Sequence, residues 1–233
     1  MQFTLDLQLC DVSTFENFIA GENKQEIEQI QQVFNTPHET GLCIWGPSGW
    51  GKSHLLQACC HQLSKEGKQA IYLPLEQHAH WTPAILEGLE QCDLICLDHI
   101  EQIINLPAWE EALFHLYNRA RDAQATLMFS ALTPPHLLPV QLKDLHSRLT
   151  WGISLPLKPL SDQEKARALQ MRAHYRGLEL SDDCTRYLFN HTTRNMKDLI
   201  QILKELDQAS LEQQRKITVP FINQILKEKK NVQ

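Results

Sequence analysis

The chain has 233 residues, enough for one sizeable domain and a smaller one. Its formal net charge of −6 argues against the broad basic surface that binds nucleic acid electrostatically. No apolar run reaches the length of a membrane span, and the seven cysteines lie mostly in apolar stretches without a C-x-x-C pair, so we expect a cytoplasmic protein with reduced thiols and no zinc site.

Residues 1–12 precede the first predicted packed element. Gln2, Leu5 and Leu7 fit the pattern Q-x-x-L-x-[LF], with which bacterial proteins bind the sliding clamp of DNA polymerase. An edge strand or a frayed terminus explains the same alternation of apolar residues, and so short a pattern also occurs by chance. The candidate clamp-binding peptide comprises Gln2, Phe3, Thr4, Leu5, Asp6 and Leu7.

A phosphate-binding loop follows the next two predicted elements. The polar run at residues 23–32 comes with Ile27, Ile30, Val33 and Phe34 at helical spacing, and residues 42–45 are apolar enough for a buried strand. Residues 46–53 (GPSGWGKS) then match G-x-x-x-x-G-K-[ST] in full, and a helix with leucines at helical spacing comes next. The candidate nucleotide-binding residues are Gly46, Pro47, Ser48, Gly49, Trp50, Gly51, Lys52, Ser53 and His54.

The chemistry of phosphate binding requires these residue types. Glycines allow backbone N–H groups to approach phosphate oxygens where a Cβ would intrude, and the following helix adds the positive end of its dipole. Lys52 is expected to neutralise the β- and γ-phosphates, and the Ser53 hydroxyl to bind Mg²⁺. The sequence therefore predicts binding of a nucleoside di- or triphosphate.

Strands and helices alternate from the loop to about residue 157. Apolar strands are predicted at residues 69–75, 93–98, 125–130 and 153–155. Thr82 and Pro83 are expected to open a short helix that ends near Gln91. A longer helix has one apolar face, formed by Trp109, Leu113, Leu116, Tyr117 and Ala120. Such apolar strands, separated by helices, predict an α/β fold with a parallel sheet covered on both faces.

From residue 158 the pattern is helical only. Residues 161–164 (SDQE) form a capping box, and Gly177 is expected to stop the helix that follows. Ser181 is expected to cap a second helix and Asn195 to begin a third, while Thr218 and Pro220 open a fourth. The prediction is a clamp peptide at 1–12, a nucleotide-binding domain at 13–157 and a helical lid domain at 158–233.

A carboxylate ends the strand at residues 93–98. Asp98 follows four apolar residues at the edge where such sheets bind ligands, so it resembles a Walker B aspartate that holds Mg²⁺ through water. The next position, which usually carries the carboxylate that polarises the attacking water, is His99. Since an imidazole does not replace a fixed anionic base, we expect intrinsic ATP hydrolysis to be slow or absent.

Several stretches resemble the DnaA branch of the AAA+ ATPases. Their order matches that branch over nearly the whole chain, and they are most similar to its regulatory inactivators of DnaA. The resemblance implies an AAA+ nucleotide-binding domain with a C-terminal helical lid. The stretches are residues 109–119 (WEEALFHLYNR), 145–152 (LHSRLTWG), 159–162 (PLSD) and 214–221 (QRKITVPF).

The resemblance also implies a mechanism. Proteins of this subfamily are tethered to the DNA-loaded sliding clamp by an N-terminal peptide and trigger hydrolysis of ATP bound to DnaA, which ends the initiator's activity. DnaA and the clamp are therefore the implied partners, and residues 2–7 the implied tether. Arg148 matches the family's arginine finger, which acts across a subunit interface. The alternative is an ion pair within its own domain, with Asp144 as a candidate partner.

Three positions depart from the family pattern. Leu132 stands near the sensor 1 position, which is usually polar or acidic, and Lys197 stands at sensor 2 in place of arginine, with Arg194 as an alternative. His99 is the third. These departures imply ADP as a resident structural ligand, with Mg²⁺ at Ser53 and Asp98, rather than an autonomous ATPase.

Two other readings remain alongside this one. The first is an autonomous AAA+ ATPase that remodels a replication partner, against which His99 argues. The second, sequence-specific DNA binding, is not expected, because only Lys227, Lys229 and Lys230 form a basic cluster near the end of the lid. The strand-like N-terminal peptide also allows pairing with a second copy, so a homodimer stays open.

Overall fold

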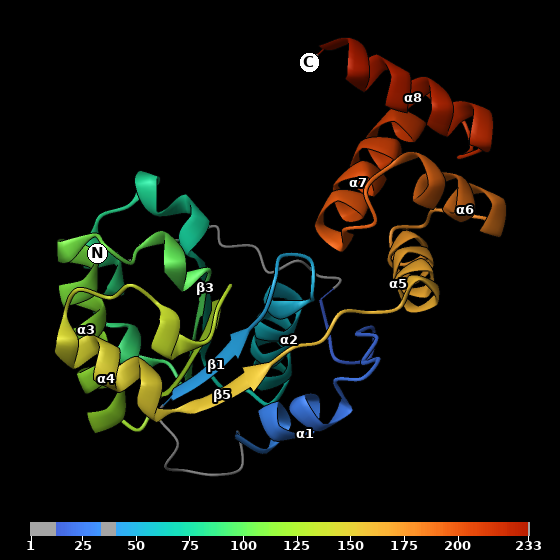
Figure 1. Cartoon of the computed structure of the whole chain (residues 1–233). Coiled ribbons are helices and arrows are strands. Elements are labelled where there is room, and N and C mark those ends of the chain that lie inside the picture. Colours follow the sequence, from blue (N-terminus) through green and yellow to red (C-terminus); the bar gives the residue numbers. More distant parts are fainter. Residues whose placement is uncertain (1–12, 34–40, 233) are drawn as a thin grey trace. The chain divides into compact units, whose positions relative to one another are not determined.

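The structure is a computed structural model, which describes residues 13–33 and 41–232 (Figure 1). The chain divides into two compact units, residues 1–158 and residues 159–233, which are described separately below. The candidate clamp peptide at residues 2–7 lies outside the described residues, so its assignment stays a prediction.

The first unit is built on a parallel sheet. Its strands have the order β2-β3-β4-β1-β5, and every neighbouring pair is parallel. Because β4 lies between β1 and β3, the ends of these three strands meet at one edge of the sheet. The strands are β1 (Gly41–Trp45), β2 (Ala70–Pro74), β3 (Leu94–Asp98), β4 (Thr126–Ala131) and β5 (Ile153–Pro156).

Helices cover both faces of this sheet (Figure 1). Successive side chains of a strand point to opposite faces, so Cys43 packs with α3 and α4, whereas Leu42 and Ile44 pack with α1 and α2. The predicted α/β fold with a doubly covered parallel sheet is therefore confirmed. The helices of this unit are α1 (Lys24–Val33), α2 (Lys52–Lys65), α3 (Pro107–Asp122) and α4 (Lys143–Trp151).

The helix predicted from Thr82 to Gln91 is wrong. Two short 3₁₀ helices stand there instead, η2 (Pro83–Leu86) and η3 (Leu89–Gln91), and the Thr82 side chain caps neither. Gly88 separates them with a φ of 77°, a left-handed conformation that ends the first turn. The other 3₁₀ helices are η1 (Leu75–His80), η4 (Ile100–Gln102) and η5 (Pro135–Leu137).

The second unit is helical, as predicted. Ser161 and Glu164 form the capping box, and the Ser181 and Asn195 side chains accept hydrogen bonds from the first turns of their helices. Gly177 follows the first helix with a φ of 73°. The helices are α5 (Asp162–His174), α6 (Asp182–His191), α7 (Met196–Gln213) and α8 (Val219–Val232).

The core of this unit is formed by the apolar faces of its helices. Leu188, Leu199, Leu203 and Phe221 are buried at its centre, which is where the predicted stripes of α6, α7 and α8 meet. Within the described ranges, no helix of either unit is long and apolar enough to cross a membrane.

A buried carboxylate fixes the start of α4. Glu110 is 1% exposed and lies in the first turn of α3. It accepts hydrogen bonds from the backbone N–H groups of Asn105 (2.9 Å) and Leu142 (2.8 Å), and its two oxygens share that of Gln141 (3.2 and 3.1 Å). Since α4 has no side-chain cap of its own, these bonds to Gln141 and Leu142 fix the backbone that leads directly into its first turn.

We expect the substitution Glu110→Ala to lower the free energy of unfolding of the first unit by about 3 kcal/mol, because three backbone N–H groups lose a charged acceptor that is itself buried. All five tryptophans lie within residues 1–158, so tryptophan fluorescence in urea reports this unit alone. The matched control is Glu111→Ala, one position along α3, whose side chain is 73% exposed. We expect it to change stability by less than about 0.5 kcal/mol. Equal effects of the two substitutions would contradict this role of Glu110.

Candidate nucleotide site and finger helix

The phosphate loop joins β1 to α2 at the edge of the sheet. Gly46, Gly49 and Gly51 have φ values of 147°, 84° and 94°, which favour glycine. A Cβ on Gly51 would lie 2.7 Å from the Phe18 ring, so this position has no room for a side chain. Gly51 also precedes α2, whose N-terminus has no side-chain cap. The loop thus offers the unobstructed, positively polarised helix end that anions bind.

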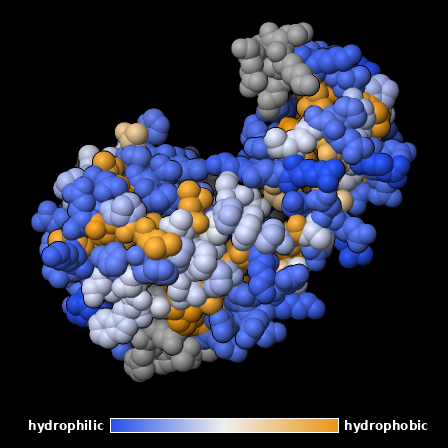
Figure 2. Space-filling view, in the orientation of Figure 1, coloured by the Kyte–Doolittle hydropathy of each residue, from blue (hydrophilic) through white to orange (hydrophobic). Residues whose placement is uncertain are grey.

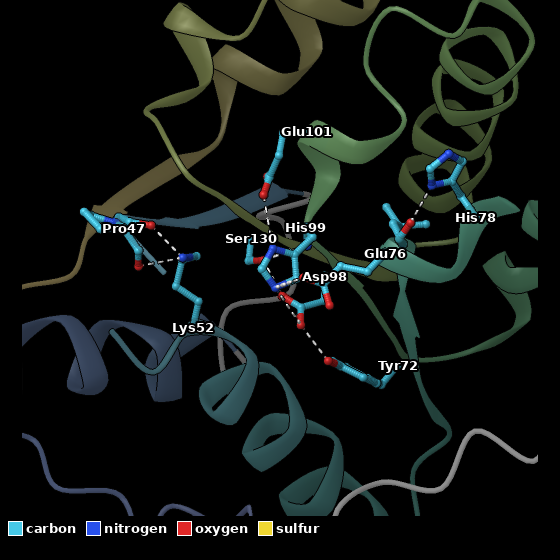
Figure 3. Close-up of polar contacts among 11 residues, drawn as sticks. Pro47, Lys52, Tyr72, Glu76, His78, Asp98, His99, Glu101 and Ser130 are labelled. Atoms are coloured by element: carbon cyan, nitrogen blue, oxygen red, sulfur yellow. Dashed lines mark hydrogen bonds and ion pairs between the residues drawn. The ribbon is translucent and has the colours of Figure 1, made fainter. Parts of the chain in front are cut away.

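Lys52 is buried beneath the loop, with 3% of its surface exposed. Its Nζ donates hydrogen bonds to the carbonyl oxygens of Gly46 at 2.5 Å and Pro47 at 3.0 Å (Figure 3). These bonds hold the ammonium inside the curve of the loop, where a phosphate group would lie. This arrangement is consistent with the predicted role of Lys52 as a Walker A lysine.

The segment before α1 packs against the end of the phosphate loop and the first turn of α2. The rings of Phe18 and His54 meet edge to face with centroids 5.1 Å apart, and His54 Nε2 lies 2.9 Å from the Thr14 carbonyl oxygen. Farther along, the Asn23 amide bonds both backbone groups of Lys158, accepting from its N–H at 2.6 Å and donating to its carbonyl at 3.1 Å. The N-terminal segment therefore joins the phosphate loop to the last residue of this unit.

Asp98 ends β3 and is 1% exposed. The Tyr72 hydroxyl donates to its Oδ2 at 2.6 Å, and the Ser130 hydroxyl donates to its Oδ1 (Figure 3). Burial and the neighbouring charge of Asp98 raise the pKa of Tyr72, so the phenol stays protonated and remains a donor. These two hydroxyls, which hold the carboxylate in one orientation, were missed by the sequence analysis. They are polar residues within otherwise apolar strands, and that was the signal available.

His99 occupies the position after Asp98 with a left-handed backbone, at φ 61° and ψ 55°. Its N–H donates to Ser130 Oγ at 2.8 Å, and its Nδ1 donates to Glu101 at 3.1 Å (Figure 3). Its Nε2 lies 3.6 Å from a Glu76 oxygen and 3.9 Å from Asp98 Oδ2. The hydrogen bond to Glu101 raises the pKa of His99, with smaller contributions from the other two carboxylates, while burial opposes it.

Two carboxylates flank the imidazole of His99. Glu101 is tied to the His99 ring, and Glu76 lies beside its other nitrogen. A carboxylate that accepts a hydrogen bond from an imidazole is a weaker base toward water than one that is not so engaged. The arrangement is poorly suited to activating a water molecule for attack on a phosphate.

The site fits Mg²⁺ held largely by a nucleotide. No group of three or more His, Cys, Asp or Glu side chains able to hold a metal exists among the residues that the structure describes. Mg²⁺ in nucleotide sites keeps several waters and takes phosphate oxygens with few protein ligands. Asp98 accepts two hydrogen bonds, which leaves lone pairs for a metal-bound water, and Ser53 stands at the first turn of α2.

Arg148 lies in the last turn of α4 and is partly exposed. Its Cζ is 5.9 Å from the centroid of the Trp151 ring. Within the described ranges no carboxylate forms an ion pair with Arg148, so the alternative pairing with Asp144 is not found. The guanidinium charge is left available to an external anion.

The two candidate sensor 2 residues differ in their contacts within the second unit. Arg194 Nη1 donates to Asp162 Oδ2 at 2.6 Å, and its Nε donates to the Phe189 carbonyl at 3.4 Å. Lys197 is exposed in the first turn of α7, which Asn195 caps. The ion pair with Asp162 holds Arg194 within this unit, and Lys197 stays the predicted sensor 2 residue.

Comparisons with known proteins follow the same division. The model of the bacterial DnaA ATPase domain matches residues 9–156, and the model of the Hda lid domain matches residues 162–226. Domain III of Thermotoga maritima DnaA has a similar structure, with a TM-score of 0.78 and 19% identity over 95% of this chain and 98% of that one.

Two further solved structures share the fold. Aquifex aeolicus DnaA bound to AMPPCP matches with a TM-score of 0.68 and 24% identity, over 88% of this chain and 68% of that chain. The Thermotoga maritima RuvB branch-migration motor matches with a TM-score of 0.63 and 20% identity, over 94% and 73%. At these identities, the structures show the AAA+ fold alone.

Proposed function

Because this chain belongs to the bacterial DnaA ATPase family and carries a lid of the Hda type, we propose that it is a regulatory inactivator of DnaA. It binds ADP, docks on ATP-bound DnaA and supplies Arg148 to that partner's nucleotide. The resulting hydrolysis of ATP on DnaA ends its competence to initiate replication. An N-terminal peptide, residues 2–7, tethers the protein to the DNA-loaded sliding clamp.

One observation carries this proposal above the others. Arg148 has no acidic partner among the described residues and stands on a helix that is braced at its start by Glu110. A guanidinium at such a position can stabilise the charge that develops on a γ-phosphate of a neighbouring subunit. An arginine that served only its own domain would be expected to pair with a carboxylate there.

Nucleotide binding by the chain itself rests on the phosphate loop. The AMPPCP-bound DnaA of Aquifex aeolicus shares the fold, and Lys52 and the uncapped N-terminus of α2 offer the groups that bind phosphate. Lys197 is the proposed lid contact to the nucleotide. Ser53 and Asp98 would hold Mg²⁺, which supplies positive charge beside the phosphates.

The alternative of an autonomous ATPase is disfavoured by His99. The imidazole stands where a water-polarising carboxylate is needed, and it hydrogen-bonds Glu101. We propose that the bound nucleotide is structural, so the protein should turn over its own ATP slowly or not at all.

The test is hydrolysis of radiolabelled ATP already bound to the cognate DnaA, with DNA-loaded clamp present. Wild-type protein should accelerate this reaction, and the double substitution Gln2→Ala, Leu5→Ala should reduce the acceleration about 10-fold or more, since the tether's effective concentration is lost. The matched control is Thr4→Ala, Asp6→Ala, which alters the positions that the clamp pattern leaves open.

Two outcomes decide between the alternatives. Loss of stimulation in both double variants, or in neither, would contradict the specific role of the clamp pattern. Wild-type protein that leaves DnaA-bound ATP intact but hydrolyses its own ATP would instead establish the autonomous ATPase.

A further inference from the structure

The most exposed tryptophan of the chain stands beside the proposed finger. Trp151, the last residue of α4, is 77% exposed, whereas the other four tryptophans are buried or half-buried. Tryptophan carries a large apolar area that usually packs against protein, and it is among the residues most enriched at the centre of interfaces. On the face of the first unit that Figure 2 shows, hydrophilic groups predominate, with apolar patches among them.

The ring of Trp151 and the guanidinium of Arg148 form one contact surface. The two residues are three apart on α4 and therefore share a face of that helix. With Cζ 5.9 Å from the ring centroid, the guanidinium lies against the aromatic face. Such a contact restrains the arginine without neutralising it, because the ring carries no net charge.

The backbone that carries Trp151 has little freedom to move. Leu145 and Leu149 bury the inner face of α4. Directly after Trp151, Gly152 lies so close to β1 that a Cβ there would stand 2.2 Å from the Gly41 carbonyl oxygen. Since Glu110 holds the other end of the helix, the exposed ring is presented on a rigid element.

We propose that Trp151 is the apolar anchor by which this face docks on the nucleotide domain of ATP-bound DnaA. The neighbouring charge identifies this partner. The Arg148 guanidinium, which has no carboxylate partner in the described part of the chain, would face a polyphosphate, and the Trp151 ring beside it would pack on an apolar surface at the rim of that phosphate site. Burial of the ring fixes the approach of α4, and Arg148 then reaches the phosphates. This inference rests on the proposed function and adds the contact that gives the finger its affinity for the partner.

The substitution Trp151→Ala separates docking from chemistry. We expect the concentration of protein that gives half-maximal stimulation of DnaA-bound ATP hydrolysis to rise about 30-fold, as for the loss of an interface hot spot. Direct binding to immobilised ATP-bound DnaA, measured by interferometry without clamp, should weaken by the same factor. Trp151→Phe, which keeps an aromatic ring, should restore most of both. The control is Tyr175→Ala, an aromatic residue of the second unit that is 55% exposed.

The outcomes that overturn the inference are distinct from those that overturn the proposed function. Unchanged binding and half-saturation for Trp151→Ala, or a lower plateau alone, would refute the anchor while leaving Arg148 as the finger. Wild-type protein that binds DnaA without stimulating hydrolysis would refute the finger, and the binding assay would still test Trp151. Because the ring is exposed, Trp151→Ala should keep the wild-type unfolding midpoint, and Trp151→Phe provides the second variant if it does not.

Discussion

Replacing Arg148 by alanine is expected to lower the stimulated rate of DnaA-bound ATP hydrolysis by about 10³-fold or more. The guanidinium is the single charge on the outer face of the last turn of α4, and no described carboxylate competes for it. A charge that stabilises the transition state on the partner's γ-phosphate changes the rate of the chemical step. The plateau of stimulation at saturating protein should therefore fall, and binding to DnaA should fall less than in Trp151→Ala.

Two variants make this result specific. Arg148→Lys keeps the charge but loses the planar fork, so it should recover only a small part of the rate. Arg121→Ala removes an exposed arginine that lies in the last turn of α3 and pairs with Asp122. This variant should stimulate hydrolysis of DnaA-bound ATP as the wild type does. If Arg148→Ala stimulates hydrolysis at saturating protein to within about twofold of wild type, the finger is refuted. The loss expected for an arginine finger is far larger.

Replacing Lys52 by alanine is expected to weaken ADP binding by about 100-fold or more. The ammonium is buried in the loop and already bonded to the Gly46 and Pro47 carbonyls, so a phosphate gains a charged donor whose position is fixed in advance. Removal of the side chain loses that charge and leaves the Gly46 and Pro47 carbonyls without this donor. Titration calorimetry with ADP, with and without Mg²⁺, measures the affinity directly.

Lys65→Ala is the matched control, because this lysine lies in the last turn of the same helix with its side chain 67% exposed. We expect it to bind ADP with wild-type affinity. Equal ADP affinity for wild type and Lys52→Ala would show that Lys52 does not bind the phosphates, and would refute ADP binding at this loop. Urea unfolding of each variant without nucleotide distinguishes a lost phosphate contact from a lost fold.

Local patterns were sufficient for much of this protein. The phosphate loop was predicted because backbone conformation and phosphate chemistry both demand glycines and a lysine at fixed spacing, and the structure gives those glycines positive φ values. The second unit was predicted because each of its helices carries its own start signal, such as Ser161 with Glu164 or Asn195. Both kinds of signal lie within a few residues of the structure that they specify.

The family assignment was also within reach of the sequence. The order of the motifs over residues 109–221 resembled the DnaA branch of the AAA+ ATPases, and the family models match residues 9–156 and 162–226. The failed prediction of a helix at residues 82–91 has a local cause. Thr82 and Pro83 are suitable for a helix start, but Gly88 ends the turn before an α-helix is established.

Only the tertiary structure decided how the site is oriented. Asp98 was recognised from its own strand, but its hydroxyl partners are Tyr72 on β2 and Ser130 on β4. The strand order that brings these residues together cannot be inferred from any one segment of the sequence. Helix α4 begins without a side-chain cap, and the residue that fixes its start is Glu110, 32 residues before Leu142. The sequence by itself predicted the phosphate loop and where the helices of the lid begin, since both depend on neighbours along the chain. The placement of Arg148 and Trp151 on a braced, outward-facing helix depends on contacts between distant segments, which only folding creates.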